Sequence, residues 1–425
     1  MIEFFEFLFK ISMGICSISL LYALVICLGS IVNGDVGVYT SPTGQKIREI
    51  HHLTDTDFRW SFYGSIAFLA AAVGPFATKF LFYLFKGKRK NTMFVIAVFS
   101  LFSWLLNCVT KVNIYGGWVA RALLGVSIGM YSSICALYLV ELSPDGYSGF
   151  YGSLNQIAIF FGQAIFSFLG PFMDYMELNY LAAAVSLVLS ISIWFIPESP
   201  VVKLNGNLVG EVKHSIFQKK YVKGIIIGIC VMFLQQFSGI NGIVANLADI
   251  FRNAGLELNP NYQSGISILS LFISSFIGSA MVDKCGRKFV WLLSSSFSFV
   301  GCFIMALNEK FEWSNILPLV CIFVYNFGFG LGLGPIPWFI VLELFDDEVR
   351  EAGNTICVVF NWIFAFVIVM SFPEMKKSMG MFGVMIFFSV VCILAILFGL
   401  IIIKDNRKEL TENEQDYIDE KSDSD

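Results

Sequence analysis

Charged residues are scarce in this chain. Asp, Glu, Lys and Arg make up only 14% of the 425 residues, against 56% hydrophobic residues, and the mean hydropathy is +0.73. A typical soluble domain carries roughly a quarter charged residues. The chain therefore lacks the charge that a globular surface needs in water, which excludes a soluble enzyme held by a single anchor.

The motifs of common enzyme classes are also missing. The sequence has no Walker loop and no recognisable constellation of nucleophile and base. Its ten cysteines lie mostly inside apolar runs without CxxC or zinc-finger spacing, where cysteine acts as a small hydrophobic residue. We therefore expect no enzyme, no metal, no cofactor and no disulfide. The net charge of −4 gives no reason to expect a nucleic acid partner.

Long apolar runs are what the sequence does contain. Because roughly 20 apolar residues cross the hydrocarbon core of a bilayer, these runs predict an all-α membrane protein with twelve transmembrane helices. The first run is long enough to span and has no clear small-residue cleavage site, so we expect a membrane helix there and not a removed signal peptide. The predicted helices are 11–33, 60–84, 91–110, 116–140, 149–171, 178–196, 222–247, 262–282, 289–307, 315–342, 353–372 and 380–403.

Basic residues gather in the segments that would lie on one side of the membrane. These clusters run from Lys86 to Lys90, Lys203 to Lys223, Lys284 to Lys288 and Lys404 to Lys408. Because cytoplasmic segments carry an excess of Lys and Arg, we predict that both termini are cytoplasmic. We expect a multi-pass protein of the plasma membrane.

A weak internal repeat relates the two halves of the chain. The Gly-Lys-Arg-Lys run at 87–90 is similar to Gly-Arg-Lys at 286–288, and Val-Glu-Leu at 140–142 is similar to Leu-Glu-Leu at 342–344. Both pairs stand six predicted helices apart, which indicates two six-helix bundles with a cavity between them. The predicted domains are an N-terminal bundle at 1–196, a short cytoplasmic linker at 197–221, a C-terminal bundle at 222–403 and an acidic cytoplasmic tail at 404–425.

Two polar runs interrupt the apolar segments of the second half. They are Gln-Gln-Phe-Ser-Gly-Ile-Asn at 235–241 and Gly-Pro-Ile-Pro-Trp at 334–338. Polar groups and helix-breaking residues at membrane depth are costly unless they are buried in protein or line a water-filled cavity. The two runs therefore predict a path for a polar solute through the membrane.

Together with further motifs, these runs make the chain resemble a sugar porter of the major facilitator superfamily, the family of the glucose transporters. The similarity covers nearly all of the chain. It implies a carrier that moves a monosaccharide, with a hexose favoured, by alternating access between two bundles. The matching pieces are Arg121 with Gly125, Glu141–Pro144, Asn155–Gln156, Pro197–Pro200, Gln235–Asn241, Asp283–Lys288, Gly334–Trp338, Glu343–Phe345 and Asn361–Trp362.

Amide side chains suit a neutral polyol, because Asn and Gln both donate and accept hydrogen bonds without the desolvation cost of a charge. Gln156 and Gln163 are seven residues apart and share a helical face. The amides of 235–241 would diverge on an unbroken helix, but a break near Ser238 and Gly239 would let them converge. With the resemblance, we predict that sugar is bound by Gln156, Gln163, Gln235, Gln236, Asn241, Trp338, Asn361 and Trp362.

The predicted roles have simpler alternatives. Amides also stitch membrane helices together, and tryptophans also pack or sit in an interfacial belt. For Trp338, the preceding Pro-x-Pro run should interrupt its helix, so that the indole offers a flat apolar face to a sugar ring.

Charged residues at the predicted cytoplasmic helix ends indicate a gate. The resemblance implies that acid–guanidinium pairs there lock the two bundles and release them on rocking, with surface charge as the alternative. The N-terminal half departs from the family pattern, because Ser148 and Val201 replace arginines and no Asp precedes Lys86. The predicted gating residues are Glu141, Glu198, Asp283, Arg287, Glu343 and Arg350.

Asp35 and Arg121 raise the question of proton coupling. Asp35 resembles the proton-binding aspartate of proton-coupled relatives, and an intramembrane pair with Arg121 would change the preferred conformation on protonation. However, Tyr39–Pro42 also resembles relatives that lack the acid, so we favour passive transport and leave proton coupling open.

The substrate and the assembly stay open. A polyol, a disaccharide or another small solute is the alternative cargo, and a sugar sensor that does not transport is the alternative of a different class. The expected partners are a sugar, the lipid bilayer and, if transport is coupled, protons; a monomer suffices for this mechanism.

Overall fold

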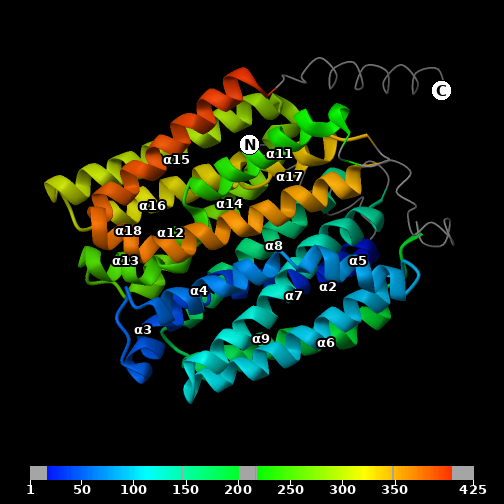
Figure 1. Cartoon of the computed structure of the whole chain (residues 1–425), viewed down its shortest axis with the longest axis horizontal. Helices are drawn as coiled ribbons and strands as arrows, with labels where there is room; N and C mark the ends of the chain where they lie inside the picture. Colours follow the sequence, from blue (N-terminus) through cyan, green and yellow to red (C-terminus); the bar gives the residue numbers. More distant parts are fainter. Residues whose placement is uncertain (1–16, 145–146, 201–215, 217, 347–348, 404–425) are drawn as a thin grey trace.

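The computed structural model describes residues 17–144, 147–200, 216, 218–346 and 349–403, and it is helical, with no strand in these ranges (Figure 1). The side chains of Ser148 and Asp283 are outside the description although their backbone is within helices. The predicted tail at 404–425, most of the predicted linker at 197–221 and the start of the first predicted helix also lie outside the described residues.

The first half of the chain, blue to teal in Figure 1, lies below the second half, green to red. Its α-helices are α2 (Ser17–Val38), α3 (Thr40–His51), α4 (Phe58–Ala71), α5 (Gly74–Leu84), α6 (Arg89–Asn107), α7 (Ile114–Glu141), α8 (Ser148–Leu169) and α9 (Tyr175–Ser192). Short 3₁₀ turns, η1 (Cys108–Lys111) and η2 (Ile193–Phe195), follow α6 and α9.

The second half begins its described helices at Lys219. They are α11 (Lys219–Phe237), α12 (Ile240–Ala245), α13 (Leu247–Ala254), α14 (Pro260–Cys285), α15 (Arg287–Phe311), α16 (Leu317–Gly328), α17 (Ile336–Glu343) and α18 (Arg350–Ile401), with the π-helical turn η3 (Phe329–Leu333) between α16 and α17.

These elements form twelve membrane spans, as predicted. Ten described helical segments are long and apolar enough to cross a membrane, and α4 with α5 forms a further span bent by 40°. The 52 residues of α18 are far too long for one crossing at about 1.5 Å per residue. Gly380, with φ 69° and ψ 171°, divides α18 into the eleventh and twelfth spans.

Close backbone packing holds the helices of each half together. Gly125 and Gly129 of α7 face α4, where an added Cβ would stand 2.1 Å from the carbonyl oxygens of Ala67 and Ala71. Only glycine permits this approach, which gives extensive van der Waals contact in a setting where lipid provides no hydrophobic drive for association. Between the halves, α8 packs on α14, α4 on α18, α2 on α12 and α3 on α13.

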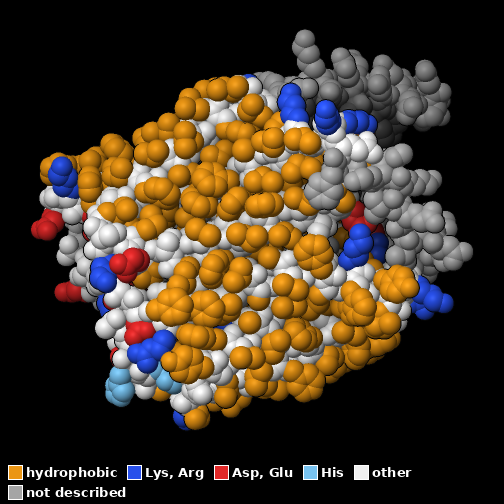
Figure 2. All heavy atoms as spheres, in the orientation of Figure 1, with side chains coloured by type: hydrophobic (Ala, Val, Ile, Leu, Met, Phe, Trp, Pro, Cys, Tyr) orange, Lys and Arg blue, Asp and Glu red, His pale blue; other side chains and the backbone are white. Residues whose placement is uncertain are grey.

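The outer surface matches a bilayer. Figure 2 shows hydrophobic side chains over the middle of the visible face, while Lys, Arg, Asp and Glu gather toward its two ends. Large apolar side chains such as Phe80, Phe102 and Leu397 are well exposed. An apolar belt of this kind is stable only when lipid covers it.

The segment after the first span differs from our expectation. We expected a loop between the first two spans, but Thr40–His51 forms the helix α3, which ends at His52 in the left-handed conformation. One side of α3 is buried, because Thr40, Ser41, Thr43, Gly44 and Ile47 face the bundles. We call the end of the molecule where α3 and α13 lie the α3 end.

Candidate functional site

A break in the seventh span brings its amides together, as the sequence predicted. Helix α11 ends at Phe237 and α12 starts at Ile240, and between them Gly239 has a φ of 108°. Across this break, Asn241 Nδ2 donates to Gln236 Oε1 at 2.6 Å. Gln236 Nε2 in turn donates to Asn361 Oδ1 of α18 at 2.8 Å. We call Gln236, Asn241 and Asn361 the amide cluster.

Gln235 stabilises the break in the tenth span. Its Nε2 donates to the carbonyl oxygens of Leu333 at 3.1 Å and Gly334 at 2.7 Å, where η3 leaves backbone groups without regular helical partners. On the other side of the same turn, Ser294 Oγ accepts from Leu333 N and donates to Gly328 O. Such replacement of lost backbone bonds is what permits a broken helix at membrane depth. This contact fits the helix-stitching alternative for the Gln235 Nε2 group, while Gln235 Oε1 has no hydrogen-bond partner among the described residues.

The two predicted tryptophans of the second half differ in their surroundings. Trp362, beside Asn361, is buried and stacks on Phe68 of α4, with ring centroids 6.3 Å apart. Its Nε1 is buried and has no hydrogen-bond partner in the described part of the chain. Trp338 follows the Pro-x-Pro break, as predicted, and is partly buried against the apolar core. The Trp362 contact places the amide cluster next to the first half of the protein.

The first half contributes two predicted glutamines from α8. Gln163 is buried, its Oε1 has no partner, and its Nε2 lies against Gly37 of α2. Gln156 is half-buried, and no hydrogen bond of its amide is recorded among the described residues. Its neighbour Asn155 accepts a hydrogen bond from Ser30 Oγ at 2.7 Å. The structure therefore does not join the α8 glutamines to the amide cluster by a direct hydrogen bond.

Arg121 is satisfied without Asp35. The guanidinium is fully buried and donates to the carbonyl oxygen of Val36 at 3.1 Å and to those of Tyr63 and Gly64 at 3.5 Å. It also lies over the rings of Tyr39 and Tyr63, at 5.3 and 5.7 Å, which stabilises a buried cation. Asp35 is buried as well, but no ion pair joins these two described residues.

The first half has a charge cluster at the end opposite α3. Arg89 at the start of α6 makes a bidentate pair with Glu141, with bonds of 3.0 and 2.9 Å, and both side chains are largely buried. Glu198 accepts from the backbone N–H groups of Arg89 and Lys90 and so caps α6. Sequence reasoning did not predict a gating role for Arg89, because the 87–90 run was used only for the internal repeat and the membrane orientation.

The second half has a corresponding pair. Arg287 at the start of α15 bonds Glu343 at the end of α17, and Arg350 Nε donates to Leu342 O at 2.9 Å. The Asp283 side chain lies outside the described part of the chain. The Arg89–Glu141 and Arg287–Glu343 pairs each lie within one half, so their predicted role in joining the two bundles stays a prediction.

The chemical character of the site is neutral. Partnerless buried atoms include the acceptors Gln163 Oε1 and Gln235 Oε1 and the donor Trp362 Nε1. Hydroxyl groups both donate and accept, so they can satisfy such atoms. Within the described ranges, the structure holds no group of three or more His, Cys, Asp or Glu side chains that could hold a metal ion.

Comparison with known proteins agrees with this character. The family model described as sugar (and other) transporter matches residues 22–202 and 202–416. A facilitated trehalose transporter of Culex quinquefasciatus is 29% identical over 94% of this chain and 85% of its own length. A homologue of a facilitated trehalose transporter from Drosophila simulans is 28% identical over 93% of this chain and 90% of its own length. A facilitated trehalose transporter of Aedes aegypti is 28% identical, and the match covers 54% of its length.

Solved structures show the same fold. A D-xylose–proton symporter superposes with a TM-score of 0.77 at 21% identity, over 91% of this chain and 98% of the symporter. The inward open form of the xylose transporter XylE from E. coli gives a TM-score of 0.77 at 21% identity, over 93% and 99%.

Proposed function

The chain belongs to the sugar (and other) transporter family, and from this premise we propose that it carries a neutral sugar across a membrane by alternating access. The observation that supports this proposal best is the amide cluster, held next to Phe68 of the other half by Trp362. A solute bound there would touch both halves, and their rocking would expose it to each side in turn. The solute leaves unchanged, so no catalytic group is required.

We propose a hexose unit as the group that the site recognises. Gln236, Asn241 and Asn361 present neutral amides, and the indoles of Trp338 and Trp362 suit the C–H face of a sugar ring. Trehalose is the second candidate, because the relatives at 28–29% identity are described as facilitated trehalose transporters. Trehalose consists of two hexose rings, so one ring could occupy the same amides.

We propose passive transport. The Arg121 guanidinium already has three carbonyl acceptors and two aromatic rings, so it does not depend on the charge of Asp35. Protonation of Asp35 would then break no ion pair and would have little effect on the balance between conformations. The word "facilitated" in the names of the relatives agrees with this view.

We also propose the orientation in the membrane. The basic clusters at 86–90 and 284–288 lie at the end opposite α3, and an excess of basic residues is typical of the cytoplasmic side. With this orientation both termini are cytoplasmic, and the α3 end faces the outside of the plasma membrane.

The experiment is uptake of radiolabelled sugar into proteoliposomes. We expect saturable uptake of glucose or trehalose that is lost in a Gln236→Leu variant, with or without a pH gradient. A Gln45→Leu variant is the matched control, because Gln45 is exposed on α3 and bonds only Glu49. Binding of sugar without uptake would indicate a sensor, and preference for a polyol over every sugar would contradict the proposed substrate class.

A further inference from the structure

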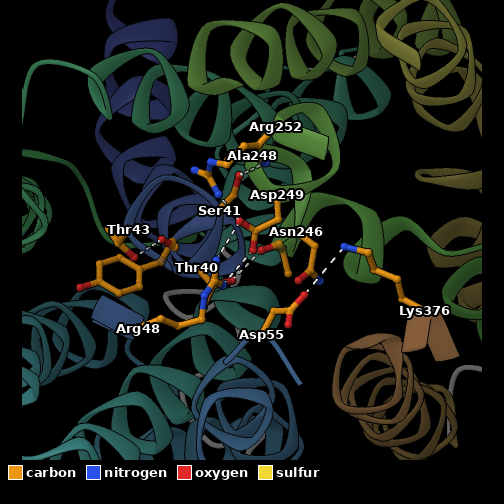
Figure 3. A network of polar contacts seen from close by, with 12 residues as sticks. Thr40, Ser41, Thr43, Arg48, Asp55, Asn246, Ala248, Asp249, Arg252 and Lys376 are labelled. Carbon is orange, nitrogen blue, oxygen red and sulfur yellow. Dashed lines mark hydrogen bonds and ion pairs between the residues drawn. The ribbon is translucent and has the colours of Figure 1, made fainter. Parts of the chain in front are cut away.

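The α3 end carries an ion pair that joins the two halves of the molecule. Arg48 of α3 and Asp249 of α13 make two parallel hydrogen bonds of 2.8 Å, Nη1 to Oδ2 and Nη2 to Oδ1, across 201 positions of sequence. Figure 3 shows the two side chains pointing toward each other from the N-terminal and C-terminal elements. They are only 11% and 20% exposed, so water screens the pair much less than a surface pair.

The halves are also joined by bonds around this pair. Thr40 Oγ1 donates to Ala245 O at 3.0 Å, and the backbone N–H of Ala248 donates to Ser41 Oγ at 3.0 Å (Figure 3). Together these contacts fix α3 against α12 and α13. At the opposite end the buried bidentate pair Arg89–Glu141 lies within one half. Lys79 and Glu351 do pair between the halves there, at 3.3 Å, but both side chains are exposed to solvent.

We propose that Arg48 and Asp249 form a latch that holds the α3 end closed and opens once in every transport cycle. This inference rests on the proposed function, because alternating access requires that the two halves separate at the α3 end for solute to enter there. While the latch is made, the bundles are held in the conformation that is closed on this side.

Each partner of the latch has a second contact within its own half. Asp249 Oδ1 also accepts from Arg252 at 2.5 Å, one turn along α13. The Arg48 guanidinium lies over the Trp60 ring of α4 at 5.0 Å. When the halves part, Asp249 keeps an arginine and Arg48 keeps an aromatic face, so neither charge is left without compensation. These second contacts lower the cost of opening and make the pair suited to repeated release.

The latch has a specific position in the path. Thr40 and Ser41 begin α3 directly after the first span, and α13 follows directly on α12, the part of the seventh span that holds Asn241. Movement of α13 away from α3 therefore acts on the same span that holds Asn241. Arg48 and Asp249 are positioning residues, because they set which side is open without contacting the proposed sugar site.

The test compares how readily the α3 end opens in the wild type and in variants of the full-length protein, in lipid nanodiscs without sugar. Hydrogen–deuterium exchange over residues 40–51 and 247–254 should be about tenfold faster in Arg48→Gln and Asp249→Asn. This is the expected size for loss of a partly buried charge-assisted pair. The double variant should be no faster than either single variant, because both act on one interaction. Arg48→Lys should be intermediate, since it keeps the charge but loses the bidentate geometry.

Arg59→Gln is the matched control. Arg59 makes a bidentate pair with Asp57 near the same end, but both residues belong to the first half. The latch would be overturned if hydrogen–deuterium exchange were accelerated as much in Arg59→Gln as in Arg48→Gln. Exchange at the wild-type rate in Arg48→Gln would overturn it as well. If Arg48→Gln fails to fold, the Arg48→Lys and Asp249→Asn variants decide in the same way.

Transport kinetics provide a second readout. Opening of the latch should lower the KM for entry from the side of α3 by about fivefold to tenfold, since it shifts the populations of two states. It should lower folding stability by no more than the ~1.4 kcal/mol that corresponds to a tenfold change. Wild-type protein that transports no sugar, but whose exchange responds to Arg48→Gln, would remove the proposed function and keep the latch. Sugar uptake by the wild type, with no change in KM or in hydrogen–deuterium exchange in the Arg48 and Asp249 variants, would keep the proposed function and overturn the latch.

Discussion

Gly239 offers the sharpest test of how the broken seventh span builds the amide cluster. In a Gly239→Ala variant the new Cβ would stand 2.5 Å from Phe388 Cδ2, and the residue would have to keep a φ of 108°. The left-handed conformation costs roughly 1–2 kcal/mol in a residue with a Cβ. Overpacking against a ring adds about 1–3 kcal/mol. We therefore expect destabilisation of about 2–5 kcal/mol.

A second glycine separates the two causes. Gly255 also has a positive φ, 73°, but an added Cβ would meet only Asn315 Nδ2 at 3.9 Å. Gly255→Ala should therefore cost about 1–2 kcal/mol, the conformational part alone. The assay is reversible unfolding of the purified protein in mixed micelles, combined with sugar uptake. Gly239→Ala should lose uptake as well as stability, because relief of the clash would turn Asn241 away from Gln236.

The double variant Gly239→Ala with Phe388→Leu completes this design. In the Phe388→Leu background the ring is gone, so the Gly239→Ala change should no longer have an overpacking cost. Its conformational cost should remain. Equal stability of Gly239→Ala and Gly255→Ala would refute the argument that the Phe388 contact fixes the break. Normal uptake in a destabilised Gly239→Ala would refute the link between the break and the amide cluster.

Four further changes test other parts of the structure. Asn361→Leu should raise the KM for sugar about tenfold, because it removes the acceptor of Gln236 Nε2 and a donor for the sugar, as initial uptake rates would show. Asp35→Asn should leave uptake within about twofold of wild type and independent of a pH gradient, and acidification-driven accumulation in the wild type would contradict passive transport. Ser294→Ala should cost about 1–3 kcal/mol in unfolding experiments, since the buried N–H of Leu333 loses its acceptor. Arg89→Gln should cost about 3 kcal/mol because it leaves Glu141 buried beside a neutral amide, and a matched Lys88→Gln variant, at an exposed position of the same run, should cost less than about 0.5 kcal/mol.

Much of the fold could be predicted because lipid imposes a strong constraint on sequence. The apolar runs predicted the twelve spans, and the breaks at Gly239 and at Gly334–Pro335 were predicted from residues that cannot continue a regular helix. Span ends were less predictable. The eleventh helix runs on through Pro373 to Met379, because polar residues beyond the apolar run can stay helical outside the hydrocarbon core.

Contacts distant in sequence could not be predicted in the same way. Arg48 and Asp249 lie in short helices between spans, where neither residue belongs to a long hydrophobic pattern. Arg89 was visible in a basic run, but its pairing with Glu141 depends on the approach of α6 to the end of α7. In both cases the sequence shows a charged residue, but the packing of the helices decides which residue it pairs with.

The sequence singled out the amide residues as a set but did not predict what each of them contacts. Gln235 and Gln236 are adjacent and chemically identical, yet one amide replaces lost backbone bonds at η3 while the other joins Asn241 to Asn361. The difference follows from helix geometry, because successive residues point about 100° apart around the axis. Adjacent polar residues in a membrane helix can therefore differ in what they bond, and here Gln235 supports a broken backbone while Gln236 belongs to the amide cluster. The Gln235 bonds support the break in the tenth span, and the break at Gly239 in the seventh span is what lets the amides of the cluster converge.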